Sequence, residues 1–214
     1  MKKLVVIGDG GHSKVVRDIV LAGNEYEWIG TLDDKYASFI EKDGRFSGPI
    51  HTVDRILERL GSQVYFVIAI GSNRIRKAVA EQLEIYDVKY AVLVHPSAII
   101  GSNVNFMPGT VVMPGAIVNS SAYIHTHCII NTNAVVEHDC ILYSYVHLSP
   151  GAILAGNVTV LEGASIGIGA KMIPSVSVGE WSTVGAGAVV IKDIPPYCTA
   201  IGVPASPMKH IKSL

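Results

Sequence analysis

From Val94 onward the sequence repeats with a period of six residues. The first position of all seventeen hexads is large and apolar: Val94, Ile100, Phe106, Val112, Val118, Ile124, Ile130, Val136, Leu142, Leu148, Leu154, Val160, Ile166, Met172, Val178, Val184 and Val190. The fifth position is small or β-branched in nearly every repeat, as in Ala116, Ala134 and Val158. The third and fourth positions often hold turn-forming pairs such as Pro108-Gly109. An uninterrupted series in constant phase indicates a repeat architecture.

A period of six fits neither an α-helix nor a simple alternating strand. It fits a short strand followed by a corner, with two inward side chains in each hexad. Three such faces close one triangular coil of about eighteen residues, and stacked coils bury each other's aliphatic faces. An ordinary β-sandwich is the alternative, but its strands do not keep a strict six-residue phase. The sequence therefore predicts an all-β parallel β-helix over residues 91–200, with a C-terminal tail at 201–214.

Residues 1–90 have a different pattern, typical of an α/β domain. The apolar run at 4–7 predicts a buried parallel strand, the glycine-rich residues 8–13 follow it, and 14–22 have helical periodicity. Further strands are expected at 28–32 and 64–70, and a further helix at about 74–83. A strand, a glycine loop and a helix in this order are typical of phosphate and nucleotide sites, because the helix N-terminus favours anions. We therefore predict a Rossmann-like βαβ domain.

A dinucleotide such as NAD is one alternative ligand for this glycine loop. Gly8 and Gly10 fit the first two glycines of the dinucleotide fingerprint, and the acidic pair Asp33-Asp34 follows about twenty residues later. However, the last glycine of the fingerprint is replaced by Ser13, and about ninety residues is short for a full cofactor domain.

Together the two halves resemble the sialic acid O-acetyltransferase and nucleotide-amino-sugar N-acetyltransferase family of hexapeptide-repeat acyltransferases. The resemblance covers nearly the whole chain and rests on these segments: the glycine loop at 8–12, Asp33-Asp34, residues 68–73, the β-helix repeats and the Gly-Val-Pro-Ala ending at 202–205. Enzymes that form UDP-N,N′-diacetylbacillosamine are most similar, and perosamine N-acetyltransferases come next. The resemblance implies a left-handed β-helix, a homotrimer, and acetyl-CoA as co-substrate without a bound cofactor.

In this family the N-terminal domain holds the nucleotide sugar. The matching positions imply the following substrate-binding residues: Gly10, Gly11, His12, Asp33 and Gly71.

The segment around residues 131–140 resembles the family's catalytic segment. It implies that His138 is the general base and that Asp139, where the family usually has Glu, increases its basicity. The resemblance also implies an acetyl-CoA site, which in this fold usually lies between two subunits, lined by His147, Asn131, Ile168 and Ala186.

Repeat geometry favours His138 independently, because it occupies a third position, at a corner of the coil. Counting eighteen residues in either direction places Ser120 and Gly156 next to it. A glycine beside a corner histidine suggests a groove for the pantetheine arm, and a bulky residue there would then weaken acetyl-CoA binding. The alternative is a glycine selected only for its backbone conformation.

The implied reaction is direct attack of an amine on a thioester carbonyl, for which a histidine base suffices. A neighbouring carboxylate would fix the tautomer and stabilise the imidazolium. A cysteine nucleophile is not favoured, because Cys128 and Cys140 occupy inward fifth positions and Cys198 has no obvious base nearby.

Two rival functions belong to other classes. A γ-class carbonic anhydrase has histidine ligands five residues apart, a spacing that the repeats here lack, although His125 and His127 could face the same way. A non-catalytic binding β-helix would leave the nucleotide domain without a purpose. Within the acetyltransferases, we predict N-acetylation of UDP-4-amino-4,6-dideoxy-N-acetylglucosamine, with GDP-perosamine N-acetylation or O-acetylation of sialic acid as alternatives.

Composition excludes some partners. The formal net charge is -1 and charged residues are only 16% of the chain, so nothing points to nucleic acid or an anionic membrane. No segment approaches the roughly 20 apolar residues of a membrane helix. The three cysteines form no paired framework, and we expect a cytoplasmic protein without a metal.

Overall fold

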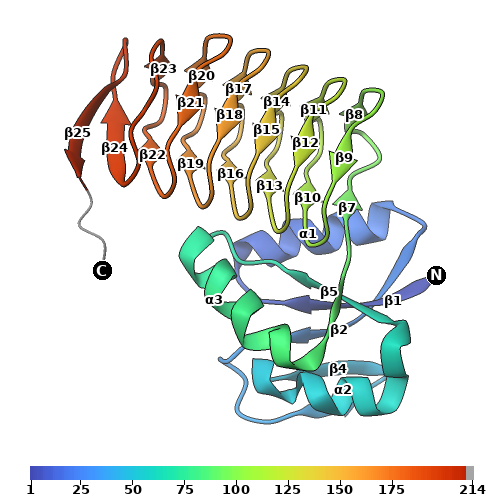
Figure 1. Cartoon of the computed structure of the whole chain (residues 1–214). Coiled ribbons are helices and arrows are strands. Elements are labelled where there is room, and N and C mark those ends of the chain that lie inside the picture. Colours follow the sequence, from blue (N-terminus) through green and yellow to red (C-terminus); the bar gives the residue numbers. More distant parts are fainter. Residues whose placement is uncertain (211–214) are drawn as a thin grey trace. The chain divides into compact units, whose positions relative to one another are not determined.

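The computed structural model describes residues 1–210, apart from the side chains of Ser62, Lys209 and His210, and the chain divides into two compact units. The first unit comprises residues 1–96, and the second begins at Ser97. Figure 1 shows the first as a sheet with helices and the second as a series of coils.

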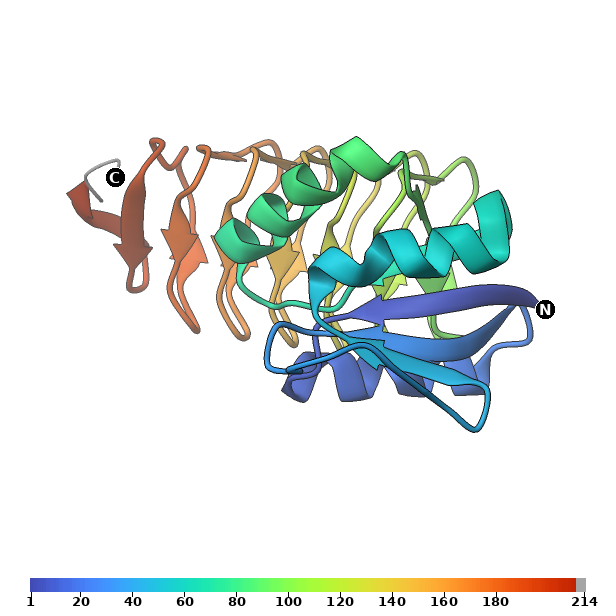
Figure 2. The ribbon, with the colours of Figure 1, turned by 90° about the horizontal axis from the view of Figure 1, so that it is seen from below.

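The first unit is built on a six-stranded sheet with the strand order β3-β4-β2-β1-β5-β6. All neighbouring strands are parallel except the antiparallel pair β3 and β4. In Figure 2, α1 covers one face of this sheet, while α2 and α3 cover the other. The elements are β1 (Lys2–Ile7), α1 (Gly11–Ala22), β2 (Tyr26–Leu32), β3 (Ile40–Lys42), β4 (Arg45–Gly48), α2 (Val53–Leu60), β5 (Val64–Ile68), α3 (Asn73–Leu83), β6 (Lys89–Tyr90) and β7 (Leu93–Val94), with short 3-10 turns at Ile50–Thr52, Gly61–Gln63 and Glu84–Tyr86.

The Rossmann-like prediction is confirmed, and the strands and helices expected from the sequence are present with small shifts at their ends. Strand β1 is central, and both of its faces are covered, so residues 4–7 are fully buried as their apolar run predicts. Strand β2 lies on one side of β1 and β5 on the other, so the connection from β1 to β2 and the later connection from β4 to β5 run in opposite directions across the sheet. The carboxyl ends of β1 and β5 therefore form a topological switch point. The glycine loop follows β1, and Gly71 follows β5, so both lie at this edge of the sheet.

The second unit is a parallel β-helix in which strands β8 to β23 have two residues each, in keeping with the short strands that the hexads predict. One sheet contains β10 (Val111–Val112), β13 (Ile129–Ile130), β16 (His147–Leu148), β19 (Ser165–Ile166), β22 (Thr183–Val184) and β24 (Cys198–Ile201). A second contains β8 (Ile99–Ile100), β11 (Ile117–Val118), β14 (Val135–Val136), β17 (Ile153–Leu154), β20 (Lys171–Met172) and β23 (Val189–Val190). A third contains β9 (Asn105–Phe106), β12 (Tyr123–Ile124), β15 (Ile141–Leu142), β18 (Thr159–Val160) and β21 (Ser177–Val178). We call them the first, second and third faces.

Residues eighteen apart lie side by side on each face, as Ile117 and Val135 do in the pairing of β11 with β14. The first and fifth positions point inward, so nearly all of their side chains beyond the first coil are buried. The core is therefore a column of aliphatic layers, each completed by the next coil.

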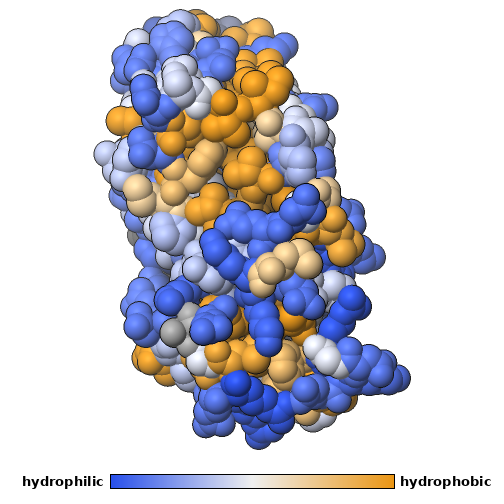
Figure 3. All heavy atoms as spheres, turned by 90° about the vertical axis from the view of Figure 1, so that its right-hand side faces the viewer, coloured by the Kyte–Doolittle hydropathy of each residue, from blue (hydrophilic) through white to orange (hydrophobic). Residues whose placement is uncertain are grey.

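The two ends of the β-helix differ. At its first coil, Ile99 and Ile100 are 62% and 38% exposed, and Figure 3, which views the molecule from that side, shows apolar surface on the β-helix. At the other end, β25 (Ser206–His210) pairs antiparallel with β24. Part of the stretch predicted as a tail thus forms a strand, while residues 211–214 lie outside the described residues. Within the described part of the chain, none of the helices has the length and apolar character needed to cross a membrane.

Candidate active site

His138 lies at the corner between β14 and β15, where the second face gives way to the third. The backbone of this corner is held from both neighbouring coils. The Asp139 N–H donates to the Ser120 carbonyl at 3.1 Å, and the His138 carbonyl accepts from the Asn157 N–H at 2.9 Å. The histidine is therefore presented from a rigid backbone rather than from a mobile loop.

The backbone conformation of Asp139 favours a small polar residue at this corner. Its φ is +59°, in the left-handed region, and five successive coils place a small polar residue in that conformation at this corner: Asn103, Ser121, Asp139, Asn157 and Ser175. Asn and Asp tolerate this region better than most residues. Because glutamate lacks that tolerance, the corner gives a backbone reason for aspartate at this position.

The side chains of His138 and Asp139 form a direct pair. Nδ1 of His138 lies 2.8 Å from Oδ2 of Asp139, and the two side chains are 63% and 60% exposed. When Nδ1 carries the ring proton and donates it to the carboxylate, Nε2 is left as a proton acceptor. This arrangement is suited to a general base whose tautomer and orientation are fixed by a carboxylate.

Gly156 lies directly against the imidazole of His138, as the eighteen-residue count predicts. A Cβ built on Gly156 would lie 2.6 Å from both Cε1 and Nε2 of the ring. The space left by the missing side chain is thus filled by the imidazole itself.

The residues implied for acetyl-CoA form a second group on the first face and its adjoining corner. Asn131 and His147 come from neighbouring coils, and Nδ2 of Asn131 lies 3.1 Å from Nε2 of His147. Ile168 and Ala186, eighteen residues apart, both lie exposed at the corner between the first and second faces. Asn131 is also fixed internally, since its Oδ1 accepts from the Thr132 N–H at 2.8 Å.

Within one chain, these two groups belong to different corners of the triangular coil. His138 and Asp139 lie at the far end of the second face from Ile168 and Ala186. The structure therefore places the His-Asp pair beside Gly156 at one corner, and the residues implied for acetyl-CoA on the first face and at another corner.

The third predicted cluster lies at the switch point of the first unit. The glycine loop is fixed by Asp33, whose Oδ2 accepts from the Asp9 N–H at 2.6 Å and whose Oδ1 accepts from the Lys35 N–H. A Cβ placed on Gly10, Gly11 or Gly71 would meet no described atom within 4 Å, so all three border open space. His12 lies in the first turn of α1. The open edge and the helix N-terminus suit an anionic ligand.

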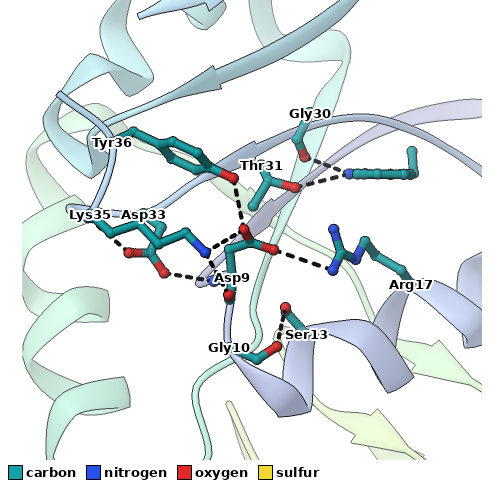
Figure 4. A network of polar contacts seen from close by, with 10 residues as sticks. Asp9, Gly10, Ser13, Arg17, Gly30, Thr31, Asp33, Lys35 and Tyr36 are labelled. Atoms are coloured by element: carbon teal, nitrogen blue, oxygen red, sulfur yellow. Dashed lines mark hydrogen bonds and ion pairs between the residues drawn. The ribbon is translucent and has the colours of Figure 1, made fainter. Parts of the chain in front are cut away.

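The centre of this cluster is Asp9, which sequence reasoning did not single out. Figure 4 shows its carboxylate between Arg17 on one side and Lys35 and Tyr36 on the other. Oδ1 lies 3.2 Å from the Arg17 guanidinium, whereas Oδ2 lies 2.6 Å from Lys35 Nζ and accepts from the Tyr36 hydroxyl at 2.7 Å. Its position between two glycines was a signal that this side chain shapes the loop.

The charge of Asp9 is stabilised by these partners. Burial raises the pKa of Asp9, but the hydrogen bonds from Lys35 and Tyr36 and the charges of Lys35 and Arg17 outweigh burial, so the pKa lies below its usual value. The same hydrogen bonds raise the pKa values of Lys35 and Tyr36. The carboxylate of Asp9 therefore stays charged at neutral pH and links the glycine loop to Arg17, Lys35 and Tyr36.

The cysteines are buried inside the β-helix. Cys128 and Cys140 donate to backbone carbonyls of Tyr143 and Ala155, and burial raises the pKa of Cys140 to about 11. A thiol with that pKa is protonated at neutral pH and is a poor nucleophile.

The histidines considered as adventitious metal ligands have ring partners instead. His125 stacks on Tyr143 with ring centroids 4.8 Å apart, and His127 stacks on Tyr145 at 5.3 Å. Among the residues that the structure describes, no three His, Cys, Asp or Glu side chains are grouped to hold a metal ion.

Comparison with known proteins identifies the family. Residues 3–83 match the family described as PglD N-terminal domain. The UDP-N-acetylbacillosamine N-acetyltransferase of Bacillus subtilis (strain 168) is 45% identical over 113 residues, which are 53% of this chain and 52% of that enzyme. The chain thus matches about half the length of this curated relative.

Solved structures match over nearly the whole chain. PerB from Caulobacter crescentus, in complex with CoA and GDP-perosamine, is 36% identical, with a TM-score of 0.88 and 97% of each chain covered. The acetyltransferase domain of PglB from Neisseria gonorrhoeae FA1090, in complex with acetyl coenzyme A, is 38% identical, with a TM-score of 0.86 and coverage of 97% of this chain and 99% of that one. These matches confirm the left-handed β-helix. The chain therefore belongs to the family of nucleotide-amino-sugar N-acetyltransferases built on a hexapeptide-repeat β-helix.

Proposed function

We propose that this protein transfers the acetyl group of acetyl-CoA to the amino group of a nucleotide-linked amino-deoxy sugar, with UDP-4-amino-4,6-dideoxy-N-acetylglucosamine as the acceptor. The observation that carries the proposal is the His138–Asp139 pair, exposed on a rigid corner with Nδ1 held 2.8 Å from the carboxylate. The 45% identity to an N-acetyltransferase of UDP-N-acetylbacillosamine favours this acceptor.

The reaction is a direct transfer. The neutral amine nitrogen attacks the thioester carbonyl carbon, Nε2 of His138 accepts the proton that the nitrogen loses, and the C–S bond breaks. The CoA thiolate leaves and takes up that proton, so that N-acetyl sugar and free CoA are the products. Asp139 stabilises the imidazolium that forms in between. Buried cysteines argue against an acetyl-enzyme intermediate.

The nucleotide part of the acceptor is expected at the switch point of the first unit. Gly10, Gly11 and Gly71 border open space there, and the N-terminus of α1 suits a diphosphate. His12 and Asp33 complete the predicted set, although both carboxylate oxygens of Asp33 already accept loop N–H groups. Asp33 would then act partly by shaping the loop.

We propose a homotrimer in which the His138 corner of one subunit meets the acetyl-CoA group of the next. Two observations support this arrangement. The two groups occupy different corners within one chain, and the outward side chains of the second face are mostly apolar: Ile99, Ile117, Val135, Ile153 and Val189, with Lys171 as the exception. An apolar face of this kind suits burial between subunits.

An alternative acceptor is GDP-perosamine, which the similarity to PerB over 97% of the chain favours. O-acetylation of sialic acid is a further possibility within the family. The cytoplasmic location expected from the sequence stays a prediction.

The test measures the release of CoA thiol from acetyl-CoA with each acceptor in turn, for the wild type and His138→Ala. His125→Ala serves as a matched control, because it removes a β-helix histidine outside the proposed site. We expect turnover with the UDP-amino sugar, a loss of about a thousandfold in His138→Ala, and near wild-type rates in the control. Undiminished turnover by His138→Ala would remove the assignment.

A further inference from the structure

Gly156 is buried beneath the ring of His138, and its backbone does not explain why it is glycine. Its φ lies outside the left-handed region, so an L-residue could adopt its conformation. Only side-chain space is limiting, since a Cβ would lie 2.6 Å from Cε1 and Nε2 and 3.2 Å from Nδ1 of His138. The ring therefore requires this glycine, and the backbone does not.

Three corner glycines that lie against a polar or aromatic side chain behave differently from Gly156. Gly109, Gly115 and Gly163 lie beneath the side chains of His127, Asn133 and Trp181, respectively. These three have φ values of +82°, +69° and +66°, which explain a glycine without the neighbour. In each of these pairs the glycine also precedes its neighbour by eighteen residues, whereas Gly156 follows His138 by eighteen.

We propose that Gly156 is a positioning residue for the general base. Because Gly156 has no side chain, the imidazole of His138 can occupy the space beside its Cα. This packing holds the ring in the orientation that brings Nδ1 to Asp139. The inference rests on the proposed function of His138. It replaces the idea of a groove for the pantetheine arm, because the imidazole fills that space.

The expected size of the effect follows from the geometry. A methyl group at position 156 has to be at least 3.4 Å from the ring atoms for ordinary contact, while the present separation would be 2.6 Å. The ring must therefore move by about 1 Å or turn into solvent, and a displacement of that size reduces catalysis by about a hundredfold. Asp139 then loses its bond to Nδ1.

The first experiment compares Gly156→Ala with the wild type in kcat and in the Kd for acetyl-CoA. Positioning predicts that kcat falls about a hundredfold while the Kd changes less than about threefold. An unchanged kcat would overturn the proposal. A raised Kd for acetyl-CoA with an unchanged kcat would overturn it as well and would favour a groove for the pantetheine arm. Gly23→Ala is the control, because its φ is −90° and its Cβ would be at ordinary contact distance from the carbonyl oxygens of Ile19 (3.4 Å) and Val20 (3.9 Å).

The second experiment is a double-mutant cycle in thermal stability with His138→Ala. The clash exists only while the imidazole is present, so Gly156→Ala is expected to lower the Tm of the wild type by a few degrees and to leave the Tm of His138→Ala unchanged. Equal shifts in both backgrounds would show that the methyl group clashes with something else and would overturn the inference. If His138→Ala itself retains activity, the proposed function fails instead, while the stability cycle still reports on the contact.

Discussion

Replacing Asp139 with Asn separates its chemical role from its role in the backbone. Asparagine tolerates the left-handed φ of +59° and still offers an oxygen to Nδ1, but it removes the negative charge. The charge lies 2.8 Å from the ring nitrogen, and Coulomb's law in a water-like dielectric gives about 1.5 kcal/mol for its attraction to the imidazolium. The pair is about 60% exposed, so this value is appropriate to a single chain.

We therefore expect kcat of Asp139→Asn to fall about tenfold, rising toward a hundredfold if a second subunit covers the pair. The loss is smaller than that of His138→Ala, because the base itself is retained. The assay is thiol release under saturating acetyl-CoA and acceptor, and the free energy of unfolding should change little. Asp139→Ala is the companion variant. It should lose as much activity and also about 1 kcal/mol of stability, since alanine is strained in the left-handed region.

Wild-type activity in Asp139→Asn would refute the carboxylate's part in catalysis. A loss as large as that of His138→Ala would refute the separation of roles, because it would mean that His138 does not act without the charge.

Three further predictions concern the rest of the chain. Asp9→Asn should destabilise the first unit by about 1–3 kcal/mol at neutral pH. Because the pKa of Asp9 is lower in the folded state, this difference in unfolding free energy should be complete above the unfolded pKa of 3.8 and should vanish as the pH falls through the folded pKa. Urea unfolding at a series of pH values measures it. Cys140, with a pKa of about 11, should resist iodoacetamide at pH 8 in the folded protein and react only after denaturation, as mass spectrometry would report; rapid labelling would contradict its burial. Gly163→Ala should cost about 2–3 kcal/mol, because its φ is +66° and its Cβ would lie 2.5 Å from the Trp181 ring; a Tm equal to the wild type would contradict that packing.

The hexad pattern predicted most of the second unit, because a six-residue phase directly encodes strand, corner and inward face. It also placed Gly156 beside His138, but it could not show that the ring fills the glycine's space, since that depends on the rotamer. The left-handed conformation of Asp139 was likewise hidden until the corners were seen together.

In the first unit, the strands at the switch point were predicted from their apolar runs. The antiparallel strand β3 and helix α2 were not, because short elements at the edge of a sheet carry no strong periodicity. The partners of Asp9 were missed for another reason. Arg17 lies in α1 and the adjacent residues Lys35 and Tyr36 follow β2, so only the folded sheet brings these two parts of the chain to one carboxylate.

The most direct test of the account is CoA release with UDP-4-amino-4,6-dideoxy-N-acetylglucosamine, GDP-perosamine and sialic acid as acceptors, with product mass determined for each. We predict rapid formation of an N-acetylated UDP-sugar and little turnover of the other two. Turnover of sialic acid alone would contradict N-acetylation, and the absence of turnover with all three would contradict the proposed acetyltransferase activity on these sugars.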